Sequence, residues 1–296
     1  MTAVYIVGVA VVDYVFSVDV FPTAAEKYRA NNAEVVGGGC GANAAVAVAR
    51  LGGAAHLSAR LGSDPVADTI LSDLRAEGVN VDQSDRSGAA SSFSSVLLNA
   101  EGERQIVNFR GAGLVESTDH IRPAPDTRAI LADTRWTEGA MAAMRVAREM
   151  GIPGVLDIEA PAERAPFDAA SHLAFSEQGL AHFYPELGPE DAIREIAAAH
   201  GGWVCVTRGA EGVSYCGPEG TGHVPAFKVD AVDTLGAGDV WHGAFALRLG
   251  EGADEISAVR FANAVSAIKC TRNGGRKGTP TRSETDDFMK EMGPFN

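Results

Sequence analysis

Short runs of almost continuous apolar residues recur along the chain, and segments with helix start and stop signals separate them. A strand that is apolar at nearly every position is typical of a sheet buried on both faces, as parallel sheets are. The pattern therefore predicts a buried parallel sheet with strands at Tyr5–Val12, Ala55–Ala59, Ala129–Ala132, Gly154–Asp157, Leu173–Phe175 and Trp203–Thr207.

Helices are predicted between these strands. Asp64 followed by Pro65 is typical of an N-cap with proline at the first helical position, and Gly78 ends that helix. Gly41–Leu51 is rich in alanine, so a helix there can pack closely against a strand. Further helices are expected at Glu138–Glu149 and Glu190–His200. This alternation predicts an α/β fold with a doubly wound, mostly parallel sheet.

Two segments depart from this rhythm. Asp13–Val36 and Ser91–Phe109 alternate polar and apolar residues, which predicts antiparallel strands with one exposed face. No linker, repeat or low-complexity stretch interrupts residues 1–296. We therefore expect a single domain that carries two insertions, at about 13–36 and 91–109.

Composition and charge narrow the possible partners. The chain has 296 residues, is 46% hydrophobic and carries a net charge of −14, which argues against nucleic acid or an anionic membrane as a partner. An anionic substrate would need a local cationic cluster. No apolar run approaches the roughly 20 residues of a membrane-spanning helix, and the N-terminus predicts a buried strand and no signal peptide. The four cysteines lack CxxC spacing, so we expect reduced thiols in a cytoplasmic protein.

The segment 233–239, DTLGAGD, carries the most specific chemistry. It places Gly236, Ala237 and Gly238 just before a helix-forming stretch, where bare amides at a helix N-terminus can hold an anion. Asp239 follows in the first turn, where it can accept a proton from a hydroxyl. The alternative is an ordinary helix entry capped by Asp239.

Segment 233–239 resembles the DTxGAGD signature of the PfkB (ribokinase-like) carbohydrate kinases at every fixed position. The resemblance implies a ribokinase-like fold in which the two insertions form a small β-sheet lid over the sugar. It also implies ATP and Mg²⁺ as cofactors. Asp239 would then deprotonate a primary alcohol as it attacks the γ-phosphorus, while the amides of Gly236, Ala237 and Gly238 stabilise the transferring oxygens.

A second glycine cluster, 37–43 (GGGCGAN), matches neither the Walker A loop nor the dinucleotide fingerprint. It resembles the family's GGxxxN stretch, which implies that Gly38, Gly39 and Asn43 bind sugar hydroxyls. Asp13 matches the family aspartate that takes a pair of sugar hydroxyls. A flexible connection and a turn-forming aspartate are the alternatives.

The nucleotide contacts are expected in the C-terminal half. Residues 206–212 (VTRGAEG) resemble the family's VTxGxxG turn, and residues 262–267 (ANAVSA) resemble the segment beside adenine. The resemblance implies nucleotide contacts by Thr207, Gly209, Gly212, Asn263 and Ala267. The family's NxxE element is replaced by SEQG at 176–179, so Mg²⁺ would be held mainly by ATP phosphates and water, with Glu177 as a candidate protein ligand.

Lys27, Asn108 and Arg135 would face the end of the sugar remote from Asp239 in a ribokinase-like arrangement. Together they would suit a compact tetrahedral anion. The alternative is that Lys27 and Arg135 are solvated surface residues.

A narrower resemblance, to bacterial sulfofructose kinases, runs over nearly the whole chain. It implies ATP-dependent phosphorylation of 6-deoxy-6-sulfofructose at O1, with the sulfonate bound by Lys27, Asn108 and Arg135. The residues that carry it are Glu26–Tyr28, Leu131–Trp136, Ala174–Leu180 and Lys269–Arg276.

Several alternatives stay open at this point. Fructose 6-phosphate or 2-keto-3-deoxygluconate could use the same cationic groups, and a catalytically silent sugar-binding regulator belongs to a different functional class. The exposed edge of the lid predicts a homodimer, because an unpaired strand edge favours a partner. For Arg272 and Arg276, phosphate contact and plain surface charge are both open.

Overall fold

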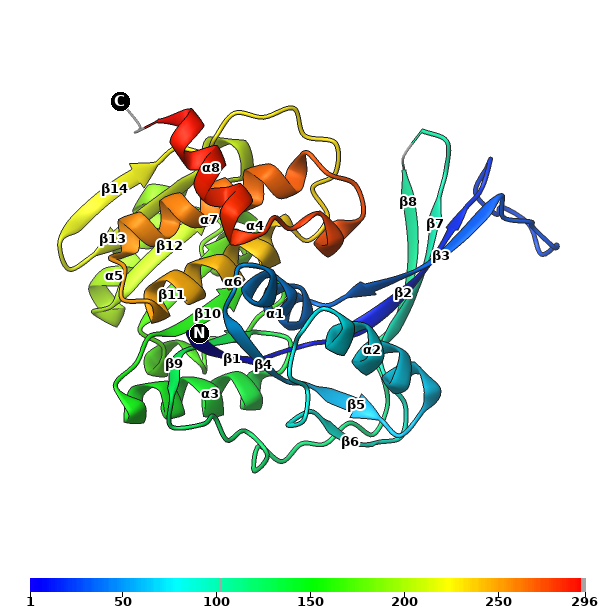
Figure 1. The fold of residues 1–296 in the computed structure, drawn as a ribbon, viewed down its shortest axis with the longest axis horizontal. Coiled ribbons are helices and arrows are strands. Elements are labelled where there is room, and N and C mark those ends of the chain that lie inside the picture. Colours follow the sequence, from blue (N-terminus) through cyan, green and yellow to red (C-terminus); the bar gives the residue numbers. More distant parts are fainter. Residues whose placement is uncertain (102, 294–296) are drawn as a thin grey trace.

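The main sheet contains eight strands in the order β14-β13-β12-β11-β10-β9-β1-β4 (Figure 1). The computed structural model describes residues 1–101 and 103–293. The six strands from β12 to β4 are parallel, and β13 and β14 extend one edge in antiparallel fashion. The strands are β1 (Ala3–Val7), β4 (Ala54–Ser58), β9 (Thr127–Asp133), β10 (Gly154–Ile158), β11 (His172–Ser176), β12 (Trp203–Thr207), β13 (Val213–Gly217) and β14 (Gly220–Val224).

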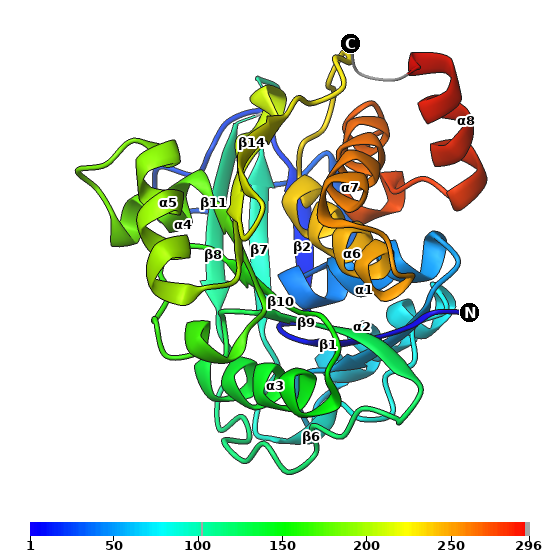
Figure 2. The same cartoon turned by 90° about the vertical axis from the view of Figure 1, so that its left-hand side faces the viewer.

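Helices cover both faces of this sheet, as the doubly wound pattern predicts. In the edge-on view, α3, α4 and α5 lie on one face, and α1, α6 and α7 lie on the other with α8 outside them (Figure 2). Each interface encloses its own apolar core. The helices are α1 (Cys40–Arg50), α2 (Pro65–Ala76), α3 (Thr137–Met150), α4 (Glu177–Phe183), α5 (Pro189–His200), α6 (Ala237–Gly250), α7 (Glu255–Cys270) and α8 (Arg282–Met292).

The local signals for helices act as expected. The Asp64 carboxylate caps α2 by accepting from the Ala67 amide at 2.9 Å, Pro65 occupies the first turn, and Gly78 follows the helix with φ +80°. Among the described residues, no helix is both long and apolar enough to cross a membrane.

A second sheet, here called the small sheet, has the order β3-β2-β7-β8 and projects from the main sheet (Figure 1). Its strands are β2 (Val11–Ser17), β3 (Asn32–Gly38), β7 (Phe93–Leu98) and β8 (Arg104–Phe109). The expectation of purely antiparallel pairing is wrong at the centre, where β2 and β7 pair in parallel. Each is the first strand of its own hairpin, so the two run in the same direction where the hairpins meet.

The expected strand Tyr5–Val12 is also wrong, because the run is divided between the two sheets. β1 ends at Val7 and β2 begins at Val11. Between them the chain passes so close to Asp133 that a Cβ at Gly8 would lie 2.2 Å from the Asp133 Oδ2 atom. The Val9 amide donates to that oxygen at 2.7 Å. A continuous apolar pattern does not reveal this break, because the residues on both sides of it are apolar.

Several elements lack a clear signal in the sequence. β13 and β14 were not predicted, because they are short and contain polar residues and glycine. The short pair β5 (Arg60–Gly62) and β6 (Asp85–Gly88) forms a separate two-stranded sheet.

The contact between α1 and α6 generates a stability prediction. At Gly243 of α6, an added Cβ would lie 2.4 Å from the Ala44 carbonyl oxygen of α1. We expect Gly243→Ala to lower the free energy of unfolding by about 1–3 kcal/mol, because the helix backbones must separate. Denaturant unfolding measures the change, with Gly188→Ala as the control, since open space surrounds that Cβ position. Equal stability of the two variants would contradict the close packing.

Candidate active site

The N-terminus of α6 combines a left-handed glycine with open space. Gly236 is the N-cap residue with φ +72°, a left-handed conformation that favours glycine. A Cβ at Gly238 would meet no atom within 4 Å, so an anion can approach there. The Ala237 amide already donates to the Thr234 carbonyl at 3.1 Å, which leaves it less available than expected.

Asp239, which directly follows Gly238 in the first turn of α6, is a buried carboxylate. The Asn43 side chain of α1 donates its Nδ2 hydrogen to the Asp239 Oδ2 atom at 2.7 Å. Burial raises the pKa of Asp239 to about 6, and the negative charge of Glu159 adds to the rise while the Asn43 hydrogen bond opposes it. A carboxylate with this pKa is ionised at neutral pH and still able to take a proton.

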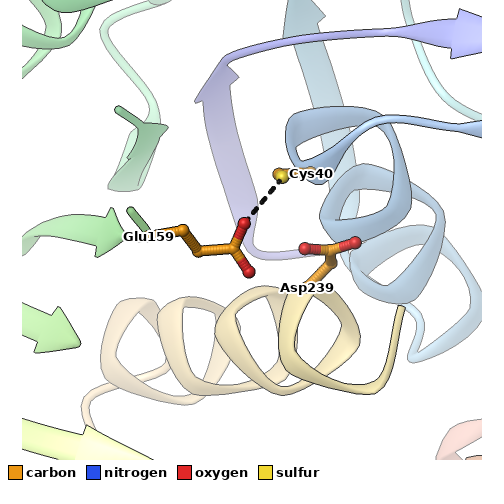
Figure 3. A group of neighbouring side chains, drawn as sticks. All are labelled: Cys40, Glu159 and Asp239. Atoms are coloured by element: carbon orange, nitrogen blue, oxygen red, sulfur yellow. Dashed lines mark hydrogen bonds between the residues drawn. The ribbon is translucent and has the colours of Figure 1, made fainter. Parts of the chain in front are cut away.

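Glu159 and Cys40 lie beside Asp239 (Figure 3). One ligand atom from each of the three side chains lies within 4.8 Å of the others. Burial raises the pKa of the Cys40 thiol well above its usual value, so it stays protonated and donates to Glu159 at 3.6 Å. Such a trio can hold a cation, but Glu159 and Asp239 each already have a protein partner.

The partner of Glu159 is Arg135, which follows β9. The guanidinium donates to the Glu159 Oε2 atom at 2.7 Å and to the Ala160 carbonyl at 3.1 Å. Glu159 therefore contacts both the candidate base and Arg135, the arginine predicted to face the remote end of the substrate.

Asp133, at the end of β9, was not predicted. Its carboxylate accepts from the amides of Val9 at 2.7 Å, Gly41 at 2.9 Å and Arg135 at 3.0 Å. These bonds join the break after β1, the start of α1 and the cationic residue. An aspartate directly after a buried strand was the available signal.

A cavity of about 450 Å³ adjoins Arg135, and two of the three predicted anion-binding residues line it. Asn108 from β8 and Arg135 line it, together with Arg60 and Arg110, which were not predicted. The Arg60 guanidinium lies 4.5 Å from the centre of the Trp136 ring. Arg110 lies two residues after Asn108, a spacing that indicates the same face of an extended strand, whereas nothing in the local sequence pattern indicates a role for Arg60.

Lys27 is not brought to this cavity. It lies exposed in the loop between β2 and β3, which is closed by bonds from the Thr23 and Ala24 amides to the Tyr28 hydroxyl. The cations that line the cavity are arginines.

Asp13 lies within β2, at the base of the small sheet. A Cβ at Gly38 would lie 2.9 Å from the Asp13 Oδ2 atom, so the glycine leaves the carboxylate accessible. Burial raises the pKa of Asp13, and a hydrogen bond with Ser94 and the charge of Arg276 oppose the rise. Gly39 is the N-cap residue of α1 with φ +95°, and the Asn43 backbone amide donates to its carbonyl at 2.8 Å.

A second cavity, of about 480 Å³, lies along the other side of the α6 N-terminus. Gly238 and all five residues predicted for the nucleotide line it. The Asn263 side-chain amide is hydrogen-bonded within the protein at both ends. Its Oδ1 atom accepts from Trp241 at 2.8 Å, and its Nδ2 atom donates to the Pro225 carbonyl at 3.1 Å. The predicted residues are Thr207, Gly209, Gly212, Asn263 and Ala267; Phe227 and Val229 were not predicted.

The segment 176–179 works as a helix start. Ser176 caps α4 by accepting from the Gly179 amide at 3.0 Å. Glu177 is in the first turn with its side chain 56% exposed, and Arg208 approaches it at 3.5 Å. Glu177 therefore already has a cationic partner.

Asp233 holds the loop that precedes α6. Its carboxylate accepts from the amides of Leu235 and Gly275 at 2.9 Å and of Gly274 at 3.0 Å. The fully buried Lys269 ammonium donates to the Asp233 carbonyl at 2.7 Å. These bonds set the position of the glycines that follow.

Comparisons with known proteins agree with this geometry. The chain is 31% identical to ribokinase of Bacillus subtilis over 303 residues, covering 98% of this chain and 100% of the relative. It is 29% identical to fructokinase-1 of Zea mays, covering 86% of this chain and 88% of the relative.

Solved structures show the same architecture. Ribokinase of Thermotoga maritima superimposes with a TM-score of 0.84 at 27% identity, covering 98% of this chain and 100% of that one. Fructokinase of Xylella fastidiosa, solved with bound ATP, superimposes with a TM-score of 0.81 at 25% identity, covering 98% of each chain. The predicted ribokinase-like fold, with a mostly parallel sheet and a smaller sheet, is confirmed.

The family model of the pfkB carbohydrate kinases matches residues 1–282 of the chain. Together with the match to B. subtilis ribokinase over 98% of the chain, this shows that the protein belongs to the pfkB family of carbohydrate kinases.

Proposed function

We propose that this carbohydrate kinase transfers the γ-phosphoryl group of ATP to O1 of 6-deoxy-6-sulfofructose, forming 6-deoxy-6-sulfofructose 1-phosphate. The observation that carries the proposal is the cavity lined by three arginines and Asn108, of which Arg135 pairs with Glu159, the neighbour of Asp239. A neutral sugar would not need three guanidinium groups.

The cavity suits a compact anion for electrostatic reasons. Guanidinium groups offer paired N–H donors that match the oxygens of a sulfonate, phosphate or carboxylate. The net charge of −14 repels anions over the protein as a whole, so a local cluster has to attract them. Arg60 and Arg110 supply such a cluster, and Arg135, which also pairs with Glu159, extends it.

The second cavity suits ATP. Its volume of about 480 Å³, its apolar wall and its opening at Gly238 would hold a nucleoside with the phosphates at the α6 N-terminus. Mg²⁺ keeps several waters and prefers oxygen ligands, so the phosphate oxygens would provide most of its coordination. Glu177 is proposed only as a further ligand, since Arg208 already approaches it.

The proposed step uses Asp239 as general base. Asp239 accepts the proton of the sugar hydroxyl while the hydroxyl oxygen forms a bond to the γ-phosphorus, and the bond from that phosphorus to ADP breaks. The amides at Gly236 and Gly238 would stabilise the transferring oxygens. Asn43 holds the carboxylate in place by its 2.7 Å hydrogen bond.

Other substrates remain candidates. Fructose 6-phosphate and 2-keto-3-deoxygluconate also carry an anion, and the same arginines would attract them. A silent sugar-binding regulator is disfavoured, because the Gly-Ala-Gly-Asp sequence at the α6 N-terminus is intact and the space at Gly238 is open.

The small sheet is the proposed lid, and its outer strand is the proposed dimer contact. β8 is an edge strand on which Ile106 and Val107 are 57% and 72% exposed. A homodimer formed there would cover the edge and these apolar side chains. Closure of the small sheet over the sugar would be the way for Lys27 to approach it. A cytoplasmic location is also proposed, since all four cysteines are free thiols.

Asp239→Asn tests the catalytic base. The amide keeps the shape but cannot take the proton, so we expect turnover to fall about 10²–10⁴-fold. ATP affinity should persist, because the nucleotide cavity is untouched. Steady-state kinetics and nucleotide titration measure both quantities, and near-normal turnover would remove Asp239 from this role.

The pH profile tests the environment of that base. Because the pKa of Asp239 is about 6 and the ionised form is active, kcat/KM for the sugar should rise with pH through about 6. Glu159→Gln removes the negative neighbour that raises this pKa, so the rise should move to lower pH. Glu149→Gln is the control, since Glu149 is exposed near the end of α3 and lines neither cavity. An unchanged profile in Glu159→Gln would contradict the coupling.

Arg135→Ala tests the substrate. We expect KM for 6-deoxy-6-sulfofructose to rise by an amount worth about 2–5 kcal/mol, while KM for fructose changes little. Arg128→Ala at the opposite end of β9 is the control, because its side chain is exposed and remote from the cavity. Turnover is compared for 6-deoxy-6-sulfofructose, fructose 6-phosphate, 2-keto-3-deoxygluconate and fructose. An equal loss on fructose would refute an anion site, and faster turnover of another anionic sugar would refute the sulfonate.

A further inference from the structure

Arg276 is a buried arginine behind the candidate site. It belongs to the short helix η3 (Gly275–Gly278) and is 3% exposed. A buried guanidinium requires partners, because removing its charge from water is costly. Its Nη2 atom donates to the Asp73 carboxylate of α2, and its Nη1 atom donates to the Asn43 Oδ1 atom at 3.5 Å.

The contact with Asn43 has a chemical consequence. An asparagine side chain has one accepting end and one donating end. With Oδ1 facing Arg276, the Nδ2 group faces Asp239 and donates to it at 2.7 Å. The reversed amide would place its oxygen against the Asp239 Oδ2 atom and its N–H group against the Arg276 guanidinium, so the positive charge favours the observed orientation.

Arg276 also lies near Asp13. Its positive charge counteracts the burial that raises the pKa of that carboxyl group, and Ser94 of β7 assists by a hydrogen bond. Arg276 thus influences two of the residues assigned to sugar hydroxyls and, through Asn43, the candidate base.

The glycine cluster makes room for this guanidinium. A Cβ at Gly37 would lie 1.9 Å from the Arg276 Nη2 atom and 2.5 Å from the Asp73 Oδ2 atom. Gly37 is in β3, at the base of the small sheet. The first glycine of the cluster therefore accommodates the arginine, whereas Gly38 faces Asp13.

The same segment is attached to the loop before α6. Gly274 and Gly275 donate their amides to the Asp233 carboxylate. One stretch of chain is thus tied by its backbone to the anion-binding loop and by the Arg276 side chain to the sugar end.

We propose that Arg276 is a positioning residue for the kinase reaction, which sets the orientation of Asn43 toward Asp239 and supplies positive charge beside Asp13. This inference rests on the proposed roles of Asp239, Asn43 and Asp13. Arg276 itself does not bind phosphate or sugar in this arrangement, because its guanidinium is buried between α1, α2 and β3.

Arg276→Ala tests the proposal with the full-length enzyme and the sugar that the wild type turns over fastest. We expect kcat/KM for the sugar to fall about 10–100-fold, as for a lost charged hydrogen bond, with KM for ATP unchanged because the Asp233 bonds come from backbone amides. The acid limb of the pH profile should move to higher pH, since Asp239 loses the oriented Asn43 hydrogen bond that lowers its pKa and Asp13 loses a neighbouring positive charge.

Chemical rescue separates positioning from a structural role. Guanidinium chloride at low millimolar concentration should restore part of the lost activity in Arg276→Ala, whereas sodium chloride and urea should not. Arg276→Lys should stay impaired, because an ammonium group cannot bond Asp73 and Asn43 in the same geometry. Arg272→Ala is the matched control, since its exposed side chain pairs with Glu284 of α8.

Gly37→Ala covers the case in which Arg276→Ala does not fold. It keeps every polar group but displaces the guanidinium, so it should show the same pH shift. Loss of activity without a pH shift and without rescue, or full activity in either variant, would overturn the proposal. Because Asp239→Asn tests the catalytic assignment separately, an inactive Asp239→Asn with an unaffected Arg276→Ala would refute this inference alone.

Discussion

The site depends on keeping a carboxylate ionised inside the protein. Asp239 is buried at the N-terminus of α6, and burial opposes its negative charge. Asn43 provides a hydrogen bond at 2.7 Å that partly offsets this cost. The balance leaves a pKa of about 6, which suits a group that must be charged at rest and accept a proton during the reaction.

Neighbouring acids face the same constraint and meet it differently. Asp133 accepts three backbone amides and so joins β9 to the start of α1. Glu159 pairs with Arg135 at 2.7 Å. Asp157 has an oxygen without a hydrogen bond, and burial and the neighbouring carboxylates raise its pKa well above the usual value. Because these acids crowd one end of the sheet, any anion that enters depends on arginines placed among them.

The fold itself followed from local patterns to a large extent. Continuous apolar runs, the Asp64 cap and the alanine-rich stretch before Leu51 are each read within a few residues, and the structure has strands and helices where they predicted them. The break between β1 and β2 did not follow, because its cause is the distant Asp133. The parallel pairing of β2 with β7 likewise depends on how two separate hairpins meet.

The candidate site was only partly readable. Asp239, Asn43 and the glycines carry motifs, and Asn43 meets Asp239 across 196 residues of sequence. Lys27 matched a pattern but lies exposed outside the cavity, while Arg60 and Arg110 line it without any motif. Charge alone does not tell where a long side chain ends, because that depends on the neighbours that surround it.

The sequence by itself determined the class of fold and the glycine loop that accompanies phosphoryl transfer, because both depend on local backbone freedom and on burial patterns. Only the tertiary structure decided which charges face one another. Arg276 meets Asn43 across 233 residues, and Arg135 meets Glu159 across 24. These pairs form where the ends of different strands and helices converge, and electrostatic attraction acts over a few ångströms in space whatever the distance along the chain.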